Sequence, residues 1–156
     1  MINKTAIVLA GGKGVRLKPY TLAFPKPMLP VGEMPILEII LRQLKFHGFD
    51  KAILSLGYMN EIIISYFETK KNADYLPKIE YYVEDSPLGT SGAIKAINPT
   101  DDSFLVMNGD ILTNLDFKQM FQYHLDSKSD FTVAVRPTKH VLKYGIVEFD
   151  KSNNVK

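Results

Sequence analysis

The sequence predicts a single α/β domain in which helices cover both faces of a mainly parallel β-sheet, a three-layer α/β/α sandwich. Apolar runs with high β-propensity alternate with segments whose apolar residues recur at helical spacing, which is typical of βαβ units. A glycine-rich segment directly follows the first apolar run, at the edge where parallel α/β sheets bind ligands. The chain has 156 residues, 46% of them hydrophobic, which is enough for one compact core.

The expected elements follow one another at short intervals. In chain order they are strand 5–9, helix 35–47, strand 51–56, helix 60–68, strand 79–83, helix 90–97, strand 103–107, a helix after Asp116, strand 131–136 and strand 145–149. The first helix carries apolar residues at helical spacing, and Gly48 is placed to end it. Asn60 and Asp116 are suitable N-caps for the second and fourth helices.

The composition argues against several classes of protein. The chain has no Cys, so disulfides, thiolate metal sites and a Cys nucleophile are excluded, and a reducing compartment, the cytoplasm, is expected. No apolar run approaches the roughly 20 residues of a membrane span. The net charge is +2 and the basic residues are spread along the chain. Neither a membrane nor a nucleic acid is therefore the expected partner.

The glycine-rich loop after the first strand is suited to binding phosphate. Gly11, Gly12 and Gly14 allow a sharp turn that brings successive N–H groups toward phosphate oxygens, and Lys13 and Arg16 add positive charge. The residues of this loop match neither the dinucleotide-binding fingerprint nor the Walker A pattern. A tight turn without a ligand would explain the glycines alone equally well.

A proline-rich segment follows the loop. Lys26 stands between Pro25 and Pro27, which are expected to fix the backbone and hold the lysine on a stiff, non-helical support. Such a cation is suited to meeting a developing negative charge. The alternative is an ordinary proline-rich surface loop.

Together, residues 11–17 and 25–31 closely resemble the signature of the sugar-phosphate nucleotidyltransferases. The resemblance implies a Rossmann-like fold of the nucleotide-diphospho-sugar transferase type. It also implies an enzyme that joins a nucleoside triphosphate to a sugar 1-phosphate and releases pyrophosphate. Val15 stands where the family most often has Thr, so a phosphate-facing hydroxyl is absent there.

The resemblance also implies roles for individual residues. The catalytic residues would be Arg16, Lys26 and Asp110. The nucleotide would be bound by Leu9, Ala10, Gly11, Gly12, Lys13, Gly14, Val15, Glu84, Gly89 and Thr90. Tyr144 and Gly145 would approach the sugar phosphate, although a hairpin bend explains that glycine equally well.

Asp110 follows the fourth strand and is the expected ligand of Mg²⁺. A carboxylate is a hard oxygen ligand, and water and phosphate oxygens would complete the coordination of the metal. Asn108-Gly109-Asp110 is also an ordinary turn sequence, so the assignment depends on the neighbouring loop.

The resemblance further implies that residues 83–93 form the base-recognition loop of the family, in which Glu84 holds the position of the side chain that contacts the base. A carboxylate only accepts hydrogen bonds, which suits the N1–H and N2–H₂ donors of guanine, whereas a Gln would suit uracil or thymine better. The run 88–92 also resembles guanylyltransferases, in particular those acting on mannose 1-phosphate. GTP is therefore favoured, with thymidylyl- or uridylyltransferase specificity as the alternative. A solvent-exposed Glu before a turn is the simplest competing interpretation.

Two other functions are alternatives for a chain with these loops. A glycosyltransferase would carry Asp-x-Asp after the fourth strand, but Asp110 is followed by Ile111 and Leu112. A nucleotide sensor without turnover remains open, because binding loops do not demonstrate catalysis.

Relatives continue with a Glu-Lys-Pro stretch and a second metal-binding Asp, and neither is present in the chain. We therefore expect residues 1–156 to be one domain with an incomplete sugar-binding half, which binds nucleotide but turns over poorly. The sheet surface left exposed would favour homo-oligomers.

Overall fold

The computed structural model describes residues 4–137, 150–152 and 154. Its strands are β1 (Thr5–Leu9), β2 (Pro30–Val31), β3 (Met34–Pro35), β4 (Lys51–Leu56), β5 (Lys78–Val83) and β6 (Phe104–Asn108). Its α-helices are α1 (Ile36–Phe46), α2 (Asn60–Glu68), α3 (Gly89–Ile97) and α4 (Phe117–Ser127). Short 3₁₀ helices η1 (Val15–Leu17), η2 (Tyr20–Leu22) and η3 (Lys26–Met28) lie between β1 and β2.

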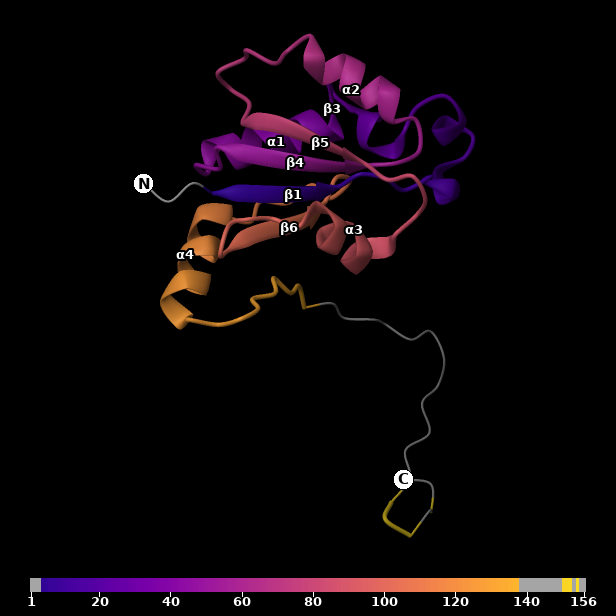
Figure 1. The fold of residues 1–156 in the computed structure, drawn as a ribbon. Coiled ribbons are helices and arrows are strands. Elements are labelled where there is room, and N and C mark those ends of the chain that lie inside the picture. Colours follow the sequence, from indigo (N-terminus) through magenta and orange to yellow (C-terminus); the bar gives the residue numbers. More distant parts are fainter. Residues whose placement is uncertain (1–3, 138–149, 153, 155–156) are drawn as a thin grey trace.

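Within the described residues, four strands form one parallel sheet in the order β5-β4-β1-β6 (Figure 1). β1 and β4 lie at its centre, and β2 pairs antiparallel with β3 as a separate ribbon. After β1 the chain adds β4 and β5 on one side of β1. After β5 it crosses over and adds β6 on the other side of β1. The loops after β1 and β6 therefore leave the sheet side by side, and in such sheets ligands bind at this point.

Helices cover both faces of the sheet, as predicted. On one face, alternate residues of β1 and β4 such as Val8 and Leu54 belong to the same buried cluster as Ile40 of α1, Phe67 of α2 and Phe121 of α4. The remaining strand residues point to the opposite face. There α3 packs against β1 and contributes the buried Ala93. The predicted three-layer α/β arrangement is confirmed.

A buried carboxylate connects two helices of the larger core. Glu38 of α1 is 0% exposed and accepts hydrogen bonds from Arg42 Nη2 at 2.6 Å, Tyr66 Oη at 2.5 Å and Lys70 Nζ at 3.0 Å. Burial raises the pKa of Glu38, but these hydrogen bonds outweigh it and hold the pKa below its ordinary value. The network ties α1 to α2 and so fixes the helix that follows the proline-rich segment.

The sequence placed most elements within one residue of their observed ends. Gly48 ends α1 with a φ of 80° and an N–H that donates to the Lys45 carbonyl oxygen. Asp116 caps α4, since its Oδ1 accepts from the N–H of Gln119 at 2.9 Å. Asn60 is not the cap of α2. Met59 holds the N-cap position, and Asn60 donates to the Gly57 carbonyl oxygen at 3.0 Å.

The strand predicted at residues 131–136 is wrong. The described residues 131–137 are in neither strand nor helix, and Phe131, Val133 and Val135 are exposed. An alternating apolar pattern becomes a strand only where a neighbouring strand supplies hydrogen bonds and a surface to cover the apolar side. No described strand pairs with this segment. The strand predicted at residues 145–149 lies outside the described residues.

None of the helices in the described ranges is both long and apolar enough to cross a membrane.

Candidate active site

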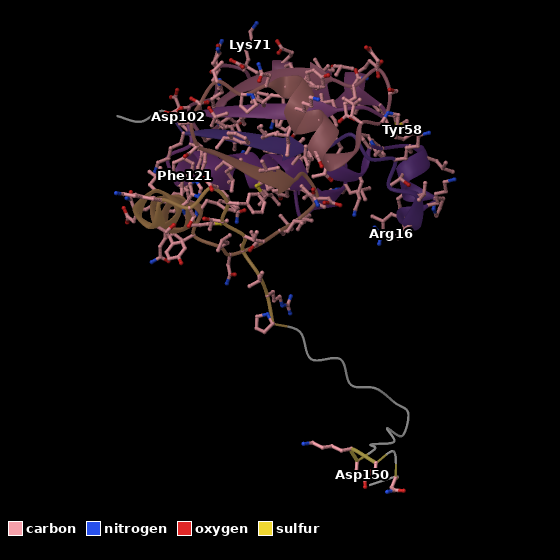
Figure 2. All side chains as sticks on the ribbon, turned by 60° about the horizontal axis from the view of Figure 1, so that its bottom comes forward. Arg16, Tyr58, Lys71, Asp102, Phe121 and Asp150 are labelled. Carbon is pink, nitrogen blue, oxygen red and sulfur yellow. The ribbon has the colours of Figure 1, made fainter. Side chains whose placement is uncertain are left out.

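A pocket of about 360 Å³ opens at the carboxyl end of the sheet, where the loops after β1, β5 and β6 meet. Figure 2 shows Arg16 and Tyr58 at this end of the molecule and Asp102 and Phe121 at the other. The pocket is lined by Leu9, Ala10, Gly11, Gly12, Gly14, Arg16, Lys26, Pro27, Glu84, Pro87, Gly89, Thr90, Ala93, Asn108 and Asp110.

Most of the residues selected from the sequence therefore lie in one pocket. Lys13 and Val15 are exceptions, because they are exposed and do not line it. Tyr144 and Gly145 lie outside the described residues.

Sequence reasoning missed four lining residues, namely Pro27, Pro87, Ala93 and Asn108. Of these four residues, only Asn108 could have been placed in the pocket from the sequence. It ends β6 in register with Leu9 of β1, so it had to lie beside the glycine-rich loop once the strand order was known.

Gly14 is required by the internal structure of the loop. It has a φ of 60° and begins η1, and a Cβ there would lie 2.9 Å from Thr21 Cγ2 and 3.0 Å from Lys26 Cβ. The Thr21 hydroxyl donates to the Gly14 carbonyl oxygen at 3.0 Å. Gly14 thereby packs the glycine-rich loop against the segment that carries Lys26.

Gly12 has no such internal reason. Its φ is outside the left-handed region, and a Cβ there would meet no atom within 4 Å. Since Gly12 lines the pocket, the empty space beside it is available to a molecule that approaches the backbone closely.

Lys26 and Asp110 form an ion pair in the pocket. Lys26 Nζ contacts Asp110 Oδ2, and the two side chains are about one-third exposed or less. Pro25 and Pro27 on either side of Lys26 are buried, and the Pro25 carbonyl oxygen accepts from the N–H of Met28 at 2.8 Å. Lys26 therefore begins a turn of 3₁₀ helix, η3, so the non-helical support predicted from the flanking prolines is wrong: Pro25 ends the extended segment and a short helix follows it. The ion pair places a cation and a carboxylate at one point of the site.

Glu84 is held in the pocket by two hydrogen bonds. Its Oε1 accepts from the Ser55 hydroxyl at 2.7 Å, and its Oε2 accepts from the backbone N–H of Leu88 at 3.1 Å. Its own N–H donates to the Leu56 carbonyl oxygen at 2.8 Å, which continues the pairing of β4 with β5 by one residue. Glu84 is thus half-buried and anchored rather than a free surface carboxylate.

Comparison with known proteins agrees with this geometry. Residues 5–156 match the family model described as nucleotidyl transferase. The chain belongs to the nucleotidyl transferase family. The family membership and the Rossmann-like α/β fold expected from residues 11–17 and 25–31 are therefore confirmed.

Two relatives show the range of chemistry within the family. A D-glycero-alpha-D-manno-heptose 1-phosphate guanylyltransferase of Aneurinibacillus thermoaerophilus is 40% identical over 144 residues, which cover 91% of this chain and 61% of the relative. A UTP--glucose-1-phosphate uridylyltransferase of Synechocystis is 33% identical over 165 residues, covering 96% of this chain and 42% of the relative. The chain thus spans less than two thirds of the length of each.

A solved structure is similar over nearly the whole chain. HddC from Yersinia pseudotuberculosis, crystallised in complex with GMP-PN, has a TM-score of 0.76 and 32% identity. The match covers 98% of this chain and 67% of that one.

In this member of the family, positively charged groups line the pocket, together with the carboxylates of Glu84 and Asp110. Gly89 and Thr90 are the first residues of α3 and line the pocket, and Leu88 at the N-cap offers no side-chain hydrogen bond to the helix. The N-terminus of a helix carries partial positive charge. Together with Arg16 and Lys26, it provides groups that attract phosphate, although Lys26 is also paired with Asp110.

The acidic residues set a limit on metal binding. No group of three His, Cys, Asp or Glu that could hold an ion occurs in the described part of the chain. A metal at Asp110 would need most of its ligands from phosphate and water. Mg²⁺ fits such a site, because it usually binds through one or two carboxylates together with substrate phosphates.

Proposed function

We propose that this protein transfers a guanylyl group from GTP to a sugar 1-phosphate, forming a nucleotide sugar and pyrophosphate. The observation that carries the proposal is the placement of an anchored carboxylate, Glu84, in the same pocket as the glycine-rich loop and Lys26.

The choice of GTP rests on the chemistry of Glu84. An ionised carboxylate presents acceptors only, and guanine offers two adjacent donors, N1–H and N2–H₂, on one edge. Uracil and thymine offer one donor between two carbonyl groups, which a carboxylate matches less well. The 40% identity to a guanylyltransferase and the similarity to a structure that contains GMP-PN support the same choice.

The proposed reaction is an in-line displacement at phosphorus. An oxygen of the sugar phosphate attacks the α-phosphorus of GTP, the bond to the oxygen bridging the α- and β-phosphates breaks, and pyrophosphate leaves with the electron pair. The attacking oxygen is already anionic, so no general base is needed. Catalysis then consists of positioning the reactants and neutralising their charge.

Within this reaction, Lys26 would stabilise charge on the α-phosphoryl oxygens. Arg16, with backbone N–H groups of the glycine-rich loop, would bind the leaving pyrophosphate. Asp110 would hold Mg²⁺, which supplies further neutralisation of phosphate charge when bound. The resemblance to the family implies these roles, and the presence of the residues in one pocket supports them.

The test is competition binding of GTP, UTP, dTTP and CTP in the presence of Mg²⁺, followed by assay of pyrophosphate release with a panel of sugar 1-phosphates. We expect GTP to bind most tightly and to be the substrate. A preference for UTP would instead support the chemistry of the Synechocystis relative. GTP binding without pyrophosphate release from any sugar 1-phosphate would favour a nucleotide sensor.

A further inference from the structure

We infer that Ser55 is a positioning residue for base selection, because its buried hydroxyl fixes the carboxylate of Glu84 in the orientation that reads guanine. The inference rests on the proposed guanine recognition by Glu84 and adds a residue that does not itself line the pocket.

The location of Ser55 makes it a rigid support. It is 0% exposed in the central strand β4, between Leu9 of β1 and Tyr82 of β5. Its carbonyl oxygen accepts from the N–H of Ala10 at 2.8 Å, so its backbone is fixed at the edge of the site. A hydroxyl in this position can move little, and it donates to Glu84 Oε1 at 2.7 Å.

The two anchors leave the carboxylate with a matched pair of free acceptor sites. Each carboxylate oxygen can accept about two hydrogen bonds. Ser55 occupies one site on Oε1 and the N–H of Leu88 occupies one on Oε2. One site therefore remains on each oxygen, and the guanine edge supplies two parallel donors.

Gly11 lies close to Oε1 of the same carboxylate and leaves room for it. A Cβ at this position would lie 3.2 Å from Glu84 Oε1 and 3.3 Å from the backbone nitrogen of Gly57. The glycine therefore leaves the space that the anchored carboxylate occupies.

Another buried hydroxyl in the same sheet provides a matched comparison. Thr5 of β1 is 1% exposed, and its Oγ1 has no hydrogen-bond partner in the described structure. It lies at the opposite end of β1 from the pocket. Removing the Thr5 hydroxyl removes a buried polar group from the sheet without touching Glu84.

The experiment measures the binding of GTP and ITP to the wild-type protein and to Ser55→Ala, with Mg²⁺ present. The base of ITP retains N1–H but lacks the N2 amino group, so the ratio of the two affinities reports whether both carboxylate oxygens are engaged. We expect Ser55→Ala to bind GTP about tenfold more weakly and to show a smaller preference for GTP over ITP. Thr5→Val should keep the wild-type ratio of the GTP and ITP affinities. Ser55→Thr should keep it as well, because threonine retains the hydroxyl.

The outcomes separate this inference from the proposed function. If wild-type protein does not prefer GTP to UTP and dTTP, the guanine assignment of Glu84 fails and the role of Ser55 falls with it. If the wild type prefers GTP and Ser55→Ala keeps the same GTP to ITP ratio, only the inference about Ser55 is overturned. Ser55→Cys replaces the hydroxyl with a weak donor and serves if the alanine variant does not fold. An intermediate ratio then supports the inference, and an unchanged ratio overturns it.

Discussion

Lys26 and Asp110, which come from η3 and from the loop after β6, contact each other directly in the pocket. The contact joins the segment flanked by prolines to the carboxyl end of the sheet and pairs the two opposite charges. A nucleotide with its metal would offer each of them a different partner, a phosphate for Lys26 and a cation for Asp110. Their proposed roles can therefore be separated by substituting one at a time.

In the full-length enzyme, Lys26→Ala should lower the rate of pyrophosphate release by about 100- to 1000-fold, because the donor proposed to stabilise the transition state is lost. The fold should change little, since the buried prolines that brace the loop remain. Steady-state kinetics and a thermal melt measure the two effects. Lys71→Ala is the control, because Lys71 is exposed and does not line the pocket. A rate near that of the wild type would remove Lys26 from the mechanism.

Asp110→Asn should weaken the Mg²⁺-dependent part of nucleotide binding, because the amide keeps the shape of the carboxylate but loses the charge that holds a hard cation. Calorimetric titration of GTP with Mg²⁺ and with EDTA measures the difference. The expected result is that the difference nearly disappears in the variant. If the variant shows the same Mg²⁺ dependence as the wild type, Asp110 does not bind the metal and is only a turn residue.

Gly14→Ala should lower the stability of the protein, whereas Gly12→Ala should weaken its binding of nucleotide. At Gly14, alanine would adopt a positive φ and contact Thr21, so we expect a loss of unfolding free energy of about 1–3 kcal/mol. At Gly12, alanine meets nothing, so stability should be unchanged while nucleotide binding weakens. Urea denaturation and GTP binding on both variants test the contrast. Unimpaired binding by Gly12→Ala would show that no ligand approaches the backbone there.

Local patterns predicted most of the fold, and the resemblance to the family selected the residues of the site. Apolar periodicity placed most strands and helices, and Gly11, Lys26, Glu84 and Asp110, which the resemblance selected, lie in one pocket. The failures were at positions decided by tertiary contacts. Residues 131–136 have an apolar alternation but no described neighbour to pair with.

Ser55 shows the same limit for the site itself. In sequence it is a polar residue within an apolar strand, and only the packing of β5 beside β4 brings Glu84 to its hydroxyl.

Glu38→Gln should destabilise the protein by about 1–3 kcal/mol at pH 7, because the charge that Arg42 and Lys70 bind is lost while both cations stay partly exposed to water. The pKa of Glu38 is lower in the folded state than its ordinary value of 4.5. Its contribution is therefore present above about pH 4.5 and is lost as the pH falls through the folded-state pKa. Urea denaturation between pH 3 and pH 7 should show a smaller pH dependence in the variant than in the wild type. Equal dependence would assign acid sensitivity to other carboxylates.

Glu84→Gln should shift the preference of the pocket from GTP toward UTP and dTTP. The N–H of Leu88 can only donate, so it selects the amide oxygen as its partner and turns the amide nitrogen toward the Ser55 hydroxyl, which can accept. The variant then presents one acceptor and one donor, which match the N3–H of uracil or thymine and a neighbouring carbonyl oxygen. Competition binding with the four triphosphates measures the change. Glu80→Gln is the control, since Glu80 pairs with Lys78 on β5 and does not line the pocket. If Glu84→Gln still prefers GTP as strongly as the wild type, the base is selected by other groups of the loop.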